Sequence, residues 1–99
     1  MTDEAFELPI DGILDLHTFQ PRDYPALLED YLGECVRAGF AEVRIVHGKG
    51  TGFQRRRVRD ILSQLPMVAS YRDAPPQAGG WGATVVFLKP LAENPKNPA

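Results

Sequence analysis

Two strand-length aliphatic segments, separated by one helical stripe, constrain the fold of this chain most. The segments are 12–17 (Gly-Ile-Leu-Asp-Leu-His) and 42–47 (Glu-Val-Arg-Ile-Val-His), and both have the length and aliphatic content of buried strands. Between them, apolar residues follow the spacing of one helix face, at Tyr24, Leu27, Leu28, Tyr31, Leu32 and Cys35. A strand–helix–strand unit crosses over with a right hand, so we expect the two strands to be parallel.

A second helix and two further strands complete the predicted order. Pro66 limits a second helix, in which the same spacing recurs at Val58, Ile61, Leu62 and Leu65. The segments 67–72 and 83–88 are predicted strands, and the loop 74–82 between them is too rich in proline and glycine for regular structure. The predicted order of elements is therefore βαβαββ.

Local signals indicate where the elements and the domain end. Asp23 is a candidate N-cap of the first helix, and Gly39 is its expected C-terminal stop. We expect an acidic N-terminal arm at 1–11, a folded domain at 12–89, and a disordered tail at 90–99, where prolines and asparagines replace large apolar residues.

The composition predicts one small domain in a reducing compartment. A chain of 99 residues with 43% hydrophobic residues can bury a core but has no room for a second domain. Its one cysteine cannot form an internal disulfide, and no secretory leader is recognisable, so we expect a cytoplasmic location. The longest apolar run, 83–88, is far shorter than the roughly 20 residues that cross a bilayer, so we expect no membrane partner.

The net charge of −2 hides a separation of charge along the chain. Nine acidic residues lie in the first 34 positions. The stretch from 44 to 59 has no carboxylate and contains Arg44, Lys49, Arg55, Arg56, Arg57 and Arg59. Such a cluster creates the local positive field that is typical of phosphate binding, and a solvated helix face is the alternative interpretation.

Polar side chains mark the ends of the two strands that we expect to be parallel. Strand alternation puts Asp15 and His17 on one face, and His47 ends the second strand. The carboxyl ends of such strands share one rim, where α/β sheets bind their ligands. An imidazole can transfer protons at neutral pH, and a carboxylate beside it can orient the ring or hold a divalent cation. Phosphodiester cleavage needs groups of this kind.

A glycine-rich loop follows the second strand and precedes the second helix. Its sequence is Gly48-Lys49-Gly50-Thr51-Gly52. Glycines let backbone amides turn toward an anion, the helix N-terminus adds its dipole, and the lysine and threonine add side-chain donors. The spacing fits neither a Walker loop nor a dinucleotide-binding loop, which argues against a nucleoside triphosphatase and a dehydrogenase. We therefore expect no organic cofactor.

Each of these features also has a purely structural interpretation. A histidine at a strand end is often bonded to the backbone, and a glycine loop can be a tight connection. Trp81, in a Gly-Gly-Trp-Gly segment, either stacks on a base or covers the core. The occurrence of all the features at one predicted edge favours a functional site.

Three motifs, in this order, resemble those of the Smr (small MutS-related) domain family. They are Leu14-Asp15-Leu16-His17, then Val46-His47-Gly48-Lys49-Gly50-Thr51-Gly52, then Gly79-Gly80-Trp81-Gly82-Ala83-Thr84 with the strand that follows. The resemblance spans about residues 12–89. It implies a two-layer α/β sandwich with a mixed four-stranded sheet and two main helices, similar to the C-terminal domain of a bacterial translation initiation factor.

The family pattern also selects particular residues of this chain. Carried over position by position, it points to Asp15, His17, His47, Gly48, Lys49, Gly50, Gly80, Gly82 and Thr84. The chain departs from the pattern at Thr18, because the family usually has glycine after the first histidine. Without that glycine the backbone approaches a ligand less freely.

The resemblance implies binding of DNA or RNA and, in many members, nicking or structure-dependent endonuclease activity, in DNA repair or recombination or in ribosome quality control. Our first hypothesis is a metal-assisted or histidine-assisted endonuclease. His17 would be the general acid or base, and Asp15 would orient it or contact Mg²⁺ or Mn²⁺. His47 would be a second proton-transfer or phosphate-contacting group. Nucleic acid would also contact Gly48, Lys49, Gly50, Thr51, Gly52, Arg55, Arg56, Arg57, Arg59, Gly80, Trp81, Gly82 and Thr84.

The second hypothesis is a DNA- or RNA-binding module without catalysis, which acts with a partner protein. Some family members are fused to mismatch-repair-like ATPases, so such an ATPase, or a ribosome-associated protein, is a candidate partner. An interaction that does not depend on salt would instead favour a purely protein-binding role.

Overall fold

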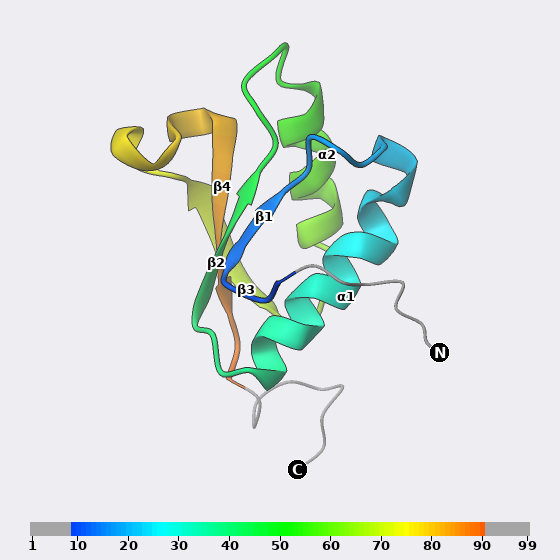
Figure 1. The fold of residues 1–99 in the computed structure, drawn as a ribbon, viewed down its shortest axis with the longest axis vertical. Helices are drawn as coiled ribbons and strands as arrows, with labels where there is room; N and C mark the ends of the chain where they lie inside the picture. Colours follow the sequence, from blue (N-terminus) through cyan, green and yellow to red (C-terminus); the bar gives the residue numbers. More distant parts are fainter. Residues whose placement is uncertain (1–8, 91–99) are drawn as a thin grey trace.

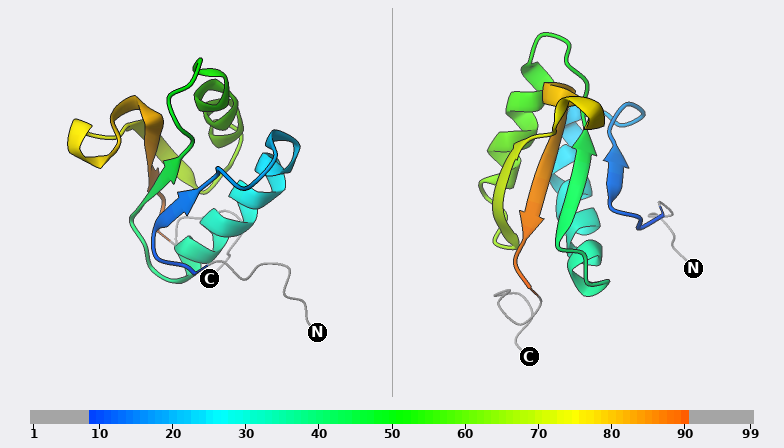
Figure 2. Two further views of the ribbon diagram at one scale, coloured as in Figure 1. Left: turned by 45° about the horizontal axis from the view of Figure 1, so that its top comes forward. Right: turned by 90° about the vertical axis from the view of Figure 1, so that its left-hand side faces the viewer.

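The computed structural model describes residues 9–90 and contains one four-stranded sheet with two helices on one of its faces (Figure 1). The strands lie in the order β1-β2-β4-β3. β1 is parallel to β2, and β4 is antiparallel to both of its neighbours, so the sheet is mixed. The second view in Figure 2 shows this order, with both helices behind the sheet. The predicted two-layer α/β sandwich with the order βαβαββ is confirmed.

The strands lie close to the predicted segments. They span Ile13–Asp15 (β1), Glu42–Val46 (β2), Val68–Asp73 (β3) and Ala83–Leu88 (β4). β1 is shorter than the predicted segment, although the backbone amide of Leu16 still donates to the Val46 carbonyl. The expected alternation is present, because Leu14 and Leu16 are buried while Asp15 and His17 are exposed.

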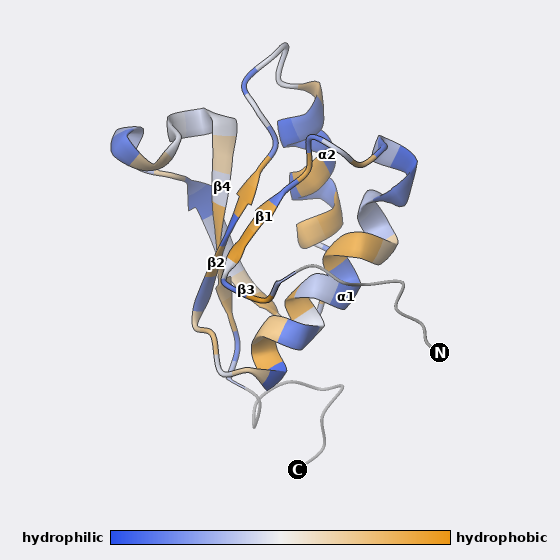
Figure 3. Ribbon diagram, in the orientation of Figure 1, coloured by the Kyte–Doolittle hydropathy of each residue, from blue (hydrophilic) through white to orange (hydrophobic). Residues whose placement is uncertain are grey.

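The two helices bury the predicted apolar stripes against the sheet. They span Tyr24–Arg37 (α1) and Phe53–Leu62 (α2). All six residues of the α1 stripe are buried, together with Val36. From α2, Val58, Ile61 and Leu62 enter the same core, and Figure 3 shows this apolar layer in the strands and the adjoining helix turns. The fourth residue of the predicted stripe, Leu65, lies beyond the end of α2 and is only partly buried against this core. The periodicity of the sequence therefore identifies the core, because only one side of each helix faces the sheet.

One local prediction was confirmed only in part, and one was wrong. Asp23 does occupy the N-cap of α1, but its side chain makes no capping hydrogen bond, because the residue belongs to a preceding 3₁₀ turn (η1, Pro21–Asp23) and has α-helical angles. The loop 74–82 is not irregular throughout, since it contains the 3₁₀ turns η2 (Pro76–Ala78) and η3 (Gly80–Gly82). Short 3₁₀ turns need only one or two hydrogen bonds and tolerate proline at their start.

The ends of the domain can be compared only in part with the prediction. The predicted arm at 1–11 and tail at 90–99 fall, except for residues 9–11 and 90, outside the described residues. The positive φ of Gly39, at 89°, ends α1 as expected, and the Gly39 amide donates to the Val36 carbonyl.

Tyr31 links α1 to the start of β1. Its side chain is fully buried, and its hydroxyl accepts a hydrogen bond from the Gly12 amide at 3.1 Å and lies 3.2 Å from the Ile13 carbonyl. Burial raises the pKa of this phenol to about 12, so the hydroxyl stays protonated and can donate. The hydrogen bonds fix the edge strand that leads to Asp15.

We predict that Tyr31→Phe lowers the free energy of unfolding by about 1–3 kcal/mol, because the Gly12 amide loses its partner. Urea denaturation measures the change. Tyr71→Phe is the matched control, because the Tyr71 hydroxyl makes no hydrogen bond among residues 9–90. An equal decrease in the free energy of unfolding in the two variants would contradict the role of the Tyr31 hydroxyl.

Candidate nucleic-acid interface

Asp15 and His17 form a polar pair just after the edge strand β1. The Asp15 carboxylate (Oδ1) accepts from the His17 backbone N–H at 2.9 Å and lies 2.5 Å from His17 Nδ1. The backbone hydrogen bond, and next the imidazole, hold the pKa of Asp15 below its ordinary value. Because the ionised carboxylate accepts, Nδ1 carries the proton of a neutral ring and Nε2 is left as a base.

His17 lies against the glycine loop, as predicted. A Cβ placed on Gly48 would lie 3.6 Å from His17 Nε2. Both side chains of the Asp15–His17 pair are more than half exposed, at 62% and 63%. Thr18, which stands where the family has glycine, needs no unusual backbone, since no non-glycine residue among those described has a positive φ. The pair is therefore open to a ligand at the loop.

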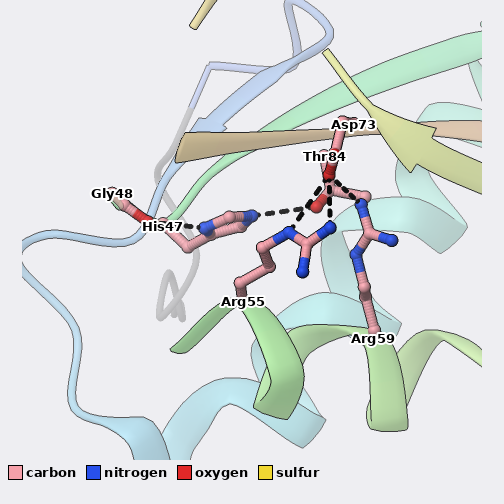
Figure 4. A network of polar contacts seen from close by, with 6 residues as sticks. All are labelled: His47, Gly48, Arg55, Arg59, Asp73 and Thr84. Atoms are coloured by element: carbon pink, nitrogen blue, oxygen red, sulfur yellow. Dashed lines mark hydrogen bonds and ion pairs between the residues drawn. The ribbon is translucent and has the colours of Figure 1, made fainter. Parts of the chain in front are cut away.

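His47, in contrast, is a buried histidine with both ring nitrogens bonded inside the protein (Figure 4). Nδ1 donates to the Gly48 carbonyl at 2.9 Å, so Nε2 accepts from the Thr84 hydroxyl at 2.8 Å. Burial lowers the pKa of His47, and the positive charges of Arg59 and Arg55 act in the same direction. With only 4% of its surface exposed, the ring does not reach a ligand, and the geometry favours a positioning role over the predicted proton transfer.

The glycine loop is held on the turn that carries the third motif. The amides of His47 and Gly48 both donate to the Gly82 carbonyl, at 3.1 and 2.8 Å. These two amides are therefore committed to the fold and do not point to an anion. The amides of Lys49, Gly50 and Thr51 donate to no carbonyl within residues 9–90, so they are the free donors of the loop.

Glycines make the loop and its support possible. Gly48, Gly50 and Gly52 have φ values of 84°, 43° and 89°, a region that other residues rarely adopt. A Cβ on Gly82 would lie 3.1 Å from Lys49 Cγ and 3.4 Å from the Lys49 amide nitrogen. The Lys49 stem thus lies on the backbone of η3, while the residue itself is exposed. We call the loop 48–52 with its support on Gly82 the cradle.

Asp73, which the sequence analysis missed, forms ion pairs with two of the arginines of α2. Its carboxylate accepts from Arg55 Nη2 at 2.8 Å and Arg59 Nη2 at 2.6 Å (Figure 4), and the Arg55 hydrogen bond chiefly lowers the pKa of Asp73. Arg56 is exposed, Arg57 is half-buried, and neither pairs with a carboxylate in the described part of the chain. The positive charge of the cluster is thus smaller than the sequence suggests, because Asp73 comes from a strand end distant in sequence.

Trp81 does not cover the core. Its side chain is 42% exposed, the Arg55 guanidinium carbon lies 5.8 Å from its ring centroid, and a Cβ on Gly52 would lie 3.9 Å from the ring. The first residue of α2, Phe53, is 58% exposed and was not selected from the sequence, although an aromatic residue directly after a glycine loop is a visible signal. The cradle is thus bordered by two exposed aromatic side chains.

The side chains at the cradle do not fit a metal site held by the protein. No group of three or more His, Cys, Asp or Glu side chains that could hold a metal ion occurs within residues 9–90. Asp15 is the carboxylate of the pair, and one of its oxygens is already occupied by His17. A magnesium ion would therefore depend on water and substrate phosphates for nearly all its ligands.

Among residues 9–90, no helix has the length and apolar character of a membrane-spanning segment.

The fold and the cradle define a small α/β domain with a glycine-rich loop at one end of a mixed sheet. The Smr domain family model matches residues 14–89, and the chain belongs to this family. All three motifs lie within the matched range.

Known proteins support the assignment. The chain is 43% identical over 76 residues to the endonuclease MutS2 of Halalkalibacterium halodurans. The matched segment is 77% of this chain and 10% of that protein. For the endonuclease MutS2 of Thermomicrobium roseum the identity is 48% over 62 residues, covering 63% of the chain and 8% of that protein. The chain thus spans about a tenth of the length of these relatives.

Two crystal structures share the fold. The Smr domain of Thermus thermophilus MutS2 matches with a TM-score of 0.74 at 37% identity, covering 79% of this chain and 98% of that one. YdaL, a stand-alone small MutS-related protein from Escherichia coli, matches with a TM-score of 0.69 at 26% identity, covering 82% of this chain and 66% of that one.

We predict that burial lowers the pKa of His47. In His17→Ala the one remaining imidazole should titrate below the ordinary value of about 6.5, as followed by NMR, because His47 is buried. Between the folded pKa of His47 and about pH 6.5, the unfolded chain carries a proton on this imidazole and the folded chain does not. The contribution of His47 to stability is therefore complete above about pH 6.5 and is lost as the pH falls through its folded pKa. A titration at or above 6.5 would contradict the buried position.

Proposed function

We propose that the chain binds DNA or RNA at the cradle and cleaves phosphodiester bonds with His17 as the proton-transferring group. The observation that carries this proposal is the exposed Asp15–His17 pair, whose Nε2 adjoins Gly48 of the cradle. Relatives that share the domain are named endonuclease MutS2, which supports the same reaction class.

Asp15 and His17 supply the basic group in this proposal. The carboxylate keeps the proton on Nδ1, so Nε2 accepts a proton from the attacking water or hydroxyl. The imidazolium that forms is stabilised by the ionised Asp15 and returns the proton to the leaving oxygen. His47 holds the cradle through Thr84 and takes no part in the proton transfer.

Lys49 and the free amides of the cradle supply the positive potential. The exposed lysine and the amides of residues 49–51 bind the phosphate oxygens and oppose the charge that grows on them. Exposed Arg56 extends the contact along the nucleic-acid backbone, while Arg55 and Arg59 are held by Asp73. Backbone contacts of this kind bind DNA and RNA alike.

A binding module without catalysis is the second candidate, and the exposure of the Asp15–His17 pair favours it. In water a hydrogen-bonded ion pair is weaker than in a closed site, so catalysis would need the substrate or a partner to exclude water. A mismatch-repair-like ATPase, of the kind to which some family members are fused, or a ribosome-associated protein would supply that surface.

We predict that His17→Ala abolishes nicking of supercoiled plasmid and cleavage of RNA, while Kd for both changes by no more than a few-fold. The reason is that the variant loses the base but keeps the cradle. Gel assays with Mg²⁺, with Mn²⁺ and with EDTA measure cleavage and its dependence on a metal ion. Arg37→Ala, on the exposed surface of α1, is the control. Cleavage by His17→Ala equal to wild type would remove His17 from the mechanism.

We also predict that Lys49→Ala weakens binding to every sequence alike and lowers the slope of log K against log salt by about 1, because one phosphate contact is lost. Fluorescence anisotropy with labelled oligonucleotides measures the slope. Arg37→Ala removes the same charge from the C-terminal end of α1, away from the cradle (Figure 1), and should leave the slope unchanged. A slope that stays at the wild-type value in Lys49→Ala would exclude Lys49 as a phosphate contact.

A further inference from the structure

Two of the three large apolar side chains that are exposed in residues 9–90 border the cradle. They are Phe53 and Trp81, and the third is Ile13 on β1. Phe53 follows Gly52 in the chain, and the Trp81 ring would lie 3.9 Å from a Cβ on the same glycine. Both aromatic side chains thus adjoin one residue of the loop that is proposed to bind phosphate.

Packing does not explain these two side chains. Phe53 begins α2 and leaves more than half of its surface in water, and neither side chain belongs to either apolar cluster of the described residues. Burying such rings is favourable by about 1.5–3 kcal/mol each, so their exposure gains nothing for the fold. Their position therefore calls for a ligand with an apolar, flat surface.

Two cationic side chains lie near Trp81. Lys49 Cε would lie 4.0 Å from a Cβ on Gly80, the neighbour of Trp81, and the Arg55 guanidinium lies 5.8 Å from the Trp81 centroid. Aromatic rings interleaved with cations are what single-stranded nucleic acid requires, because bases stack on the rings and phosphates contact the cations. Bases in a duplex are stacked on each other and reach such rings only after costly unstacking.

We propose that Phe53 and Trp81 form a stacking platform for unpaired bases, so that the cradle takes single-stranded DNA or RNA in preference to paired duplex. The inference rests on the proposed binding of phosphate at the cradle and adds the class of nucleic acid that fits there. The phosphate next to a stacked base then lies beside Lys49 and the Asp15–His17 pair, so cleavage falls in or beside unpaired segments.

The tryptophan fluorescence of this protein comes from Trp81 alone, because it is the only tryptophan of the 99 residues. The full chain is titrated with oligothymidylate, oligouridylate and a duplex, each of about 15 nucleotides, which is within the range that one such site spans. Stacking quenches the indole, so we expect saturable quenching by both single strands. The duplex should bind about tenfold more weakly and quench little.

Two substitutions separate stacking from simple apolar contact. Trp81→Leu and Phe53→Leu keep an apolar side chain but remove the ring, and each should weaken single-strand binding about tenfold. Binding is measured by anisotropy of labelled oligonucleotides, and duplex binding should stay within about twofold, since duplex bases do not reach the rings. Trp81→Phe keeps a ring and should recover most of the affinity. Ile13→Ala, which removes the third exposed apolar side chain, should change neither affinity.

The outcomes distinguish this inference from the proposed function. The stacking platform would be overturned if Trp81→Leu and Phe53→Leu lost equal affinity for single strands and for duplex, or lost no affinity at all. This holds even if His17-dependent cleavage is intact. A wild-type chain that binds neither form would overturn the proposed function and the platform with it. Circular dichroism checks folding, and Phe53→Leu carries the test even where Trp81→Leu unfolds, because Phe53 lies on the surface.

Discussion

The buried hydrogen bonds between His47, Thr84 and the Gly82 carbonyl fix the rest of the candidate site. They join the end of β2 to the start of β4, which are paired in the sheet through Val46 and Ala83. A buried donor or acceptor without a partner costs about 1–3 kcal/mol, so these groups can be satisfied in few other arrangements. The cradle is consequently held at its base by these hydrogen bonds, while Lys49, Gly50 and Thr51 are exposed to solvent. For the proposed binding of phosphate, such support would hold the loop in one arrangement before a ligand arrives.

Hydrophobic periodicity and helix-stop signals were sufficient to predict the order of the elements and most of the core, whereas the mixed sheet was expected from the resemblance to the family. The stripe of α1, the alternation around Leu14 and Leu16, and the glycine stop at Gly39 each reflect a local rule that tertiary structure had no reason to override. The prediction failed in the loop 74–82, where two short 3₁₀ turns form among the prolines and glycines. Asp23 is the N-cap that was predicted, but its side chain makes no capping hydrogen bond, because the residue also ends the 3₁₀ turn that begins at Pro21.

The candidate site was predicted less completely, because charge pairing is not visible in sequence. Arg55 and Arg59 lie in a stretch without acids, yet Asp73 reaches both from the end of β3. Its pairing depends on the register of β3 on β4, where Asp73 faces Thr84, and register is set by the whole sheet. Phe53 was not selected, although it directly follows the glycine loop; only the structure shows that its side chain is exposed there.

The two histidines show how strand position decides chemistry. Both follow an aliphatic strand, and strand pattern alone gives them the same expected role. β1 is an edge strand with one neighbour, so the chain beyond it has no partner on its outer side, and His17 remains exposed. β2 lies between β1 and β4, so the residue after it is enclosed, and His47 can stay neutral only by satisfying both nitrogens within the protein. One imidazole is therefore enclosed and bonded at both nitrogens within the protein, while the other is exposed to solvent, and the difference follows from sheet order.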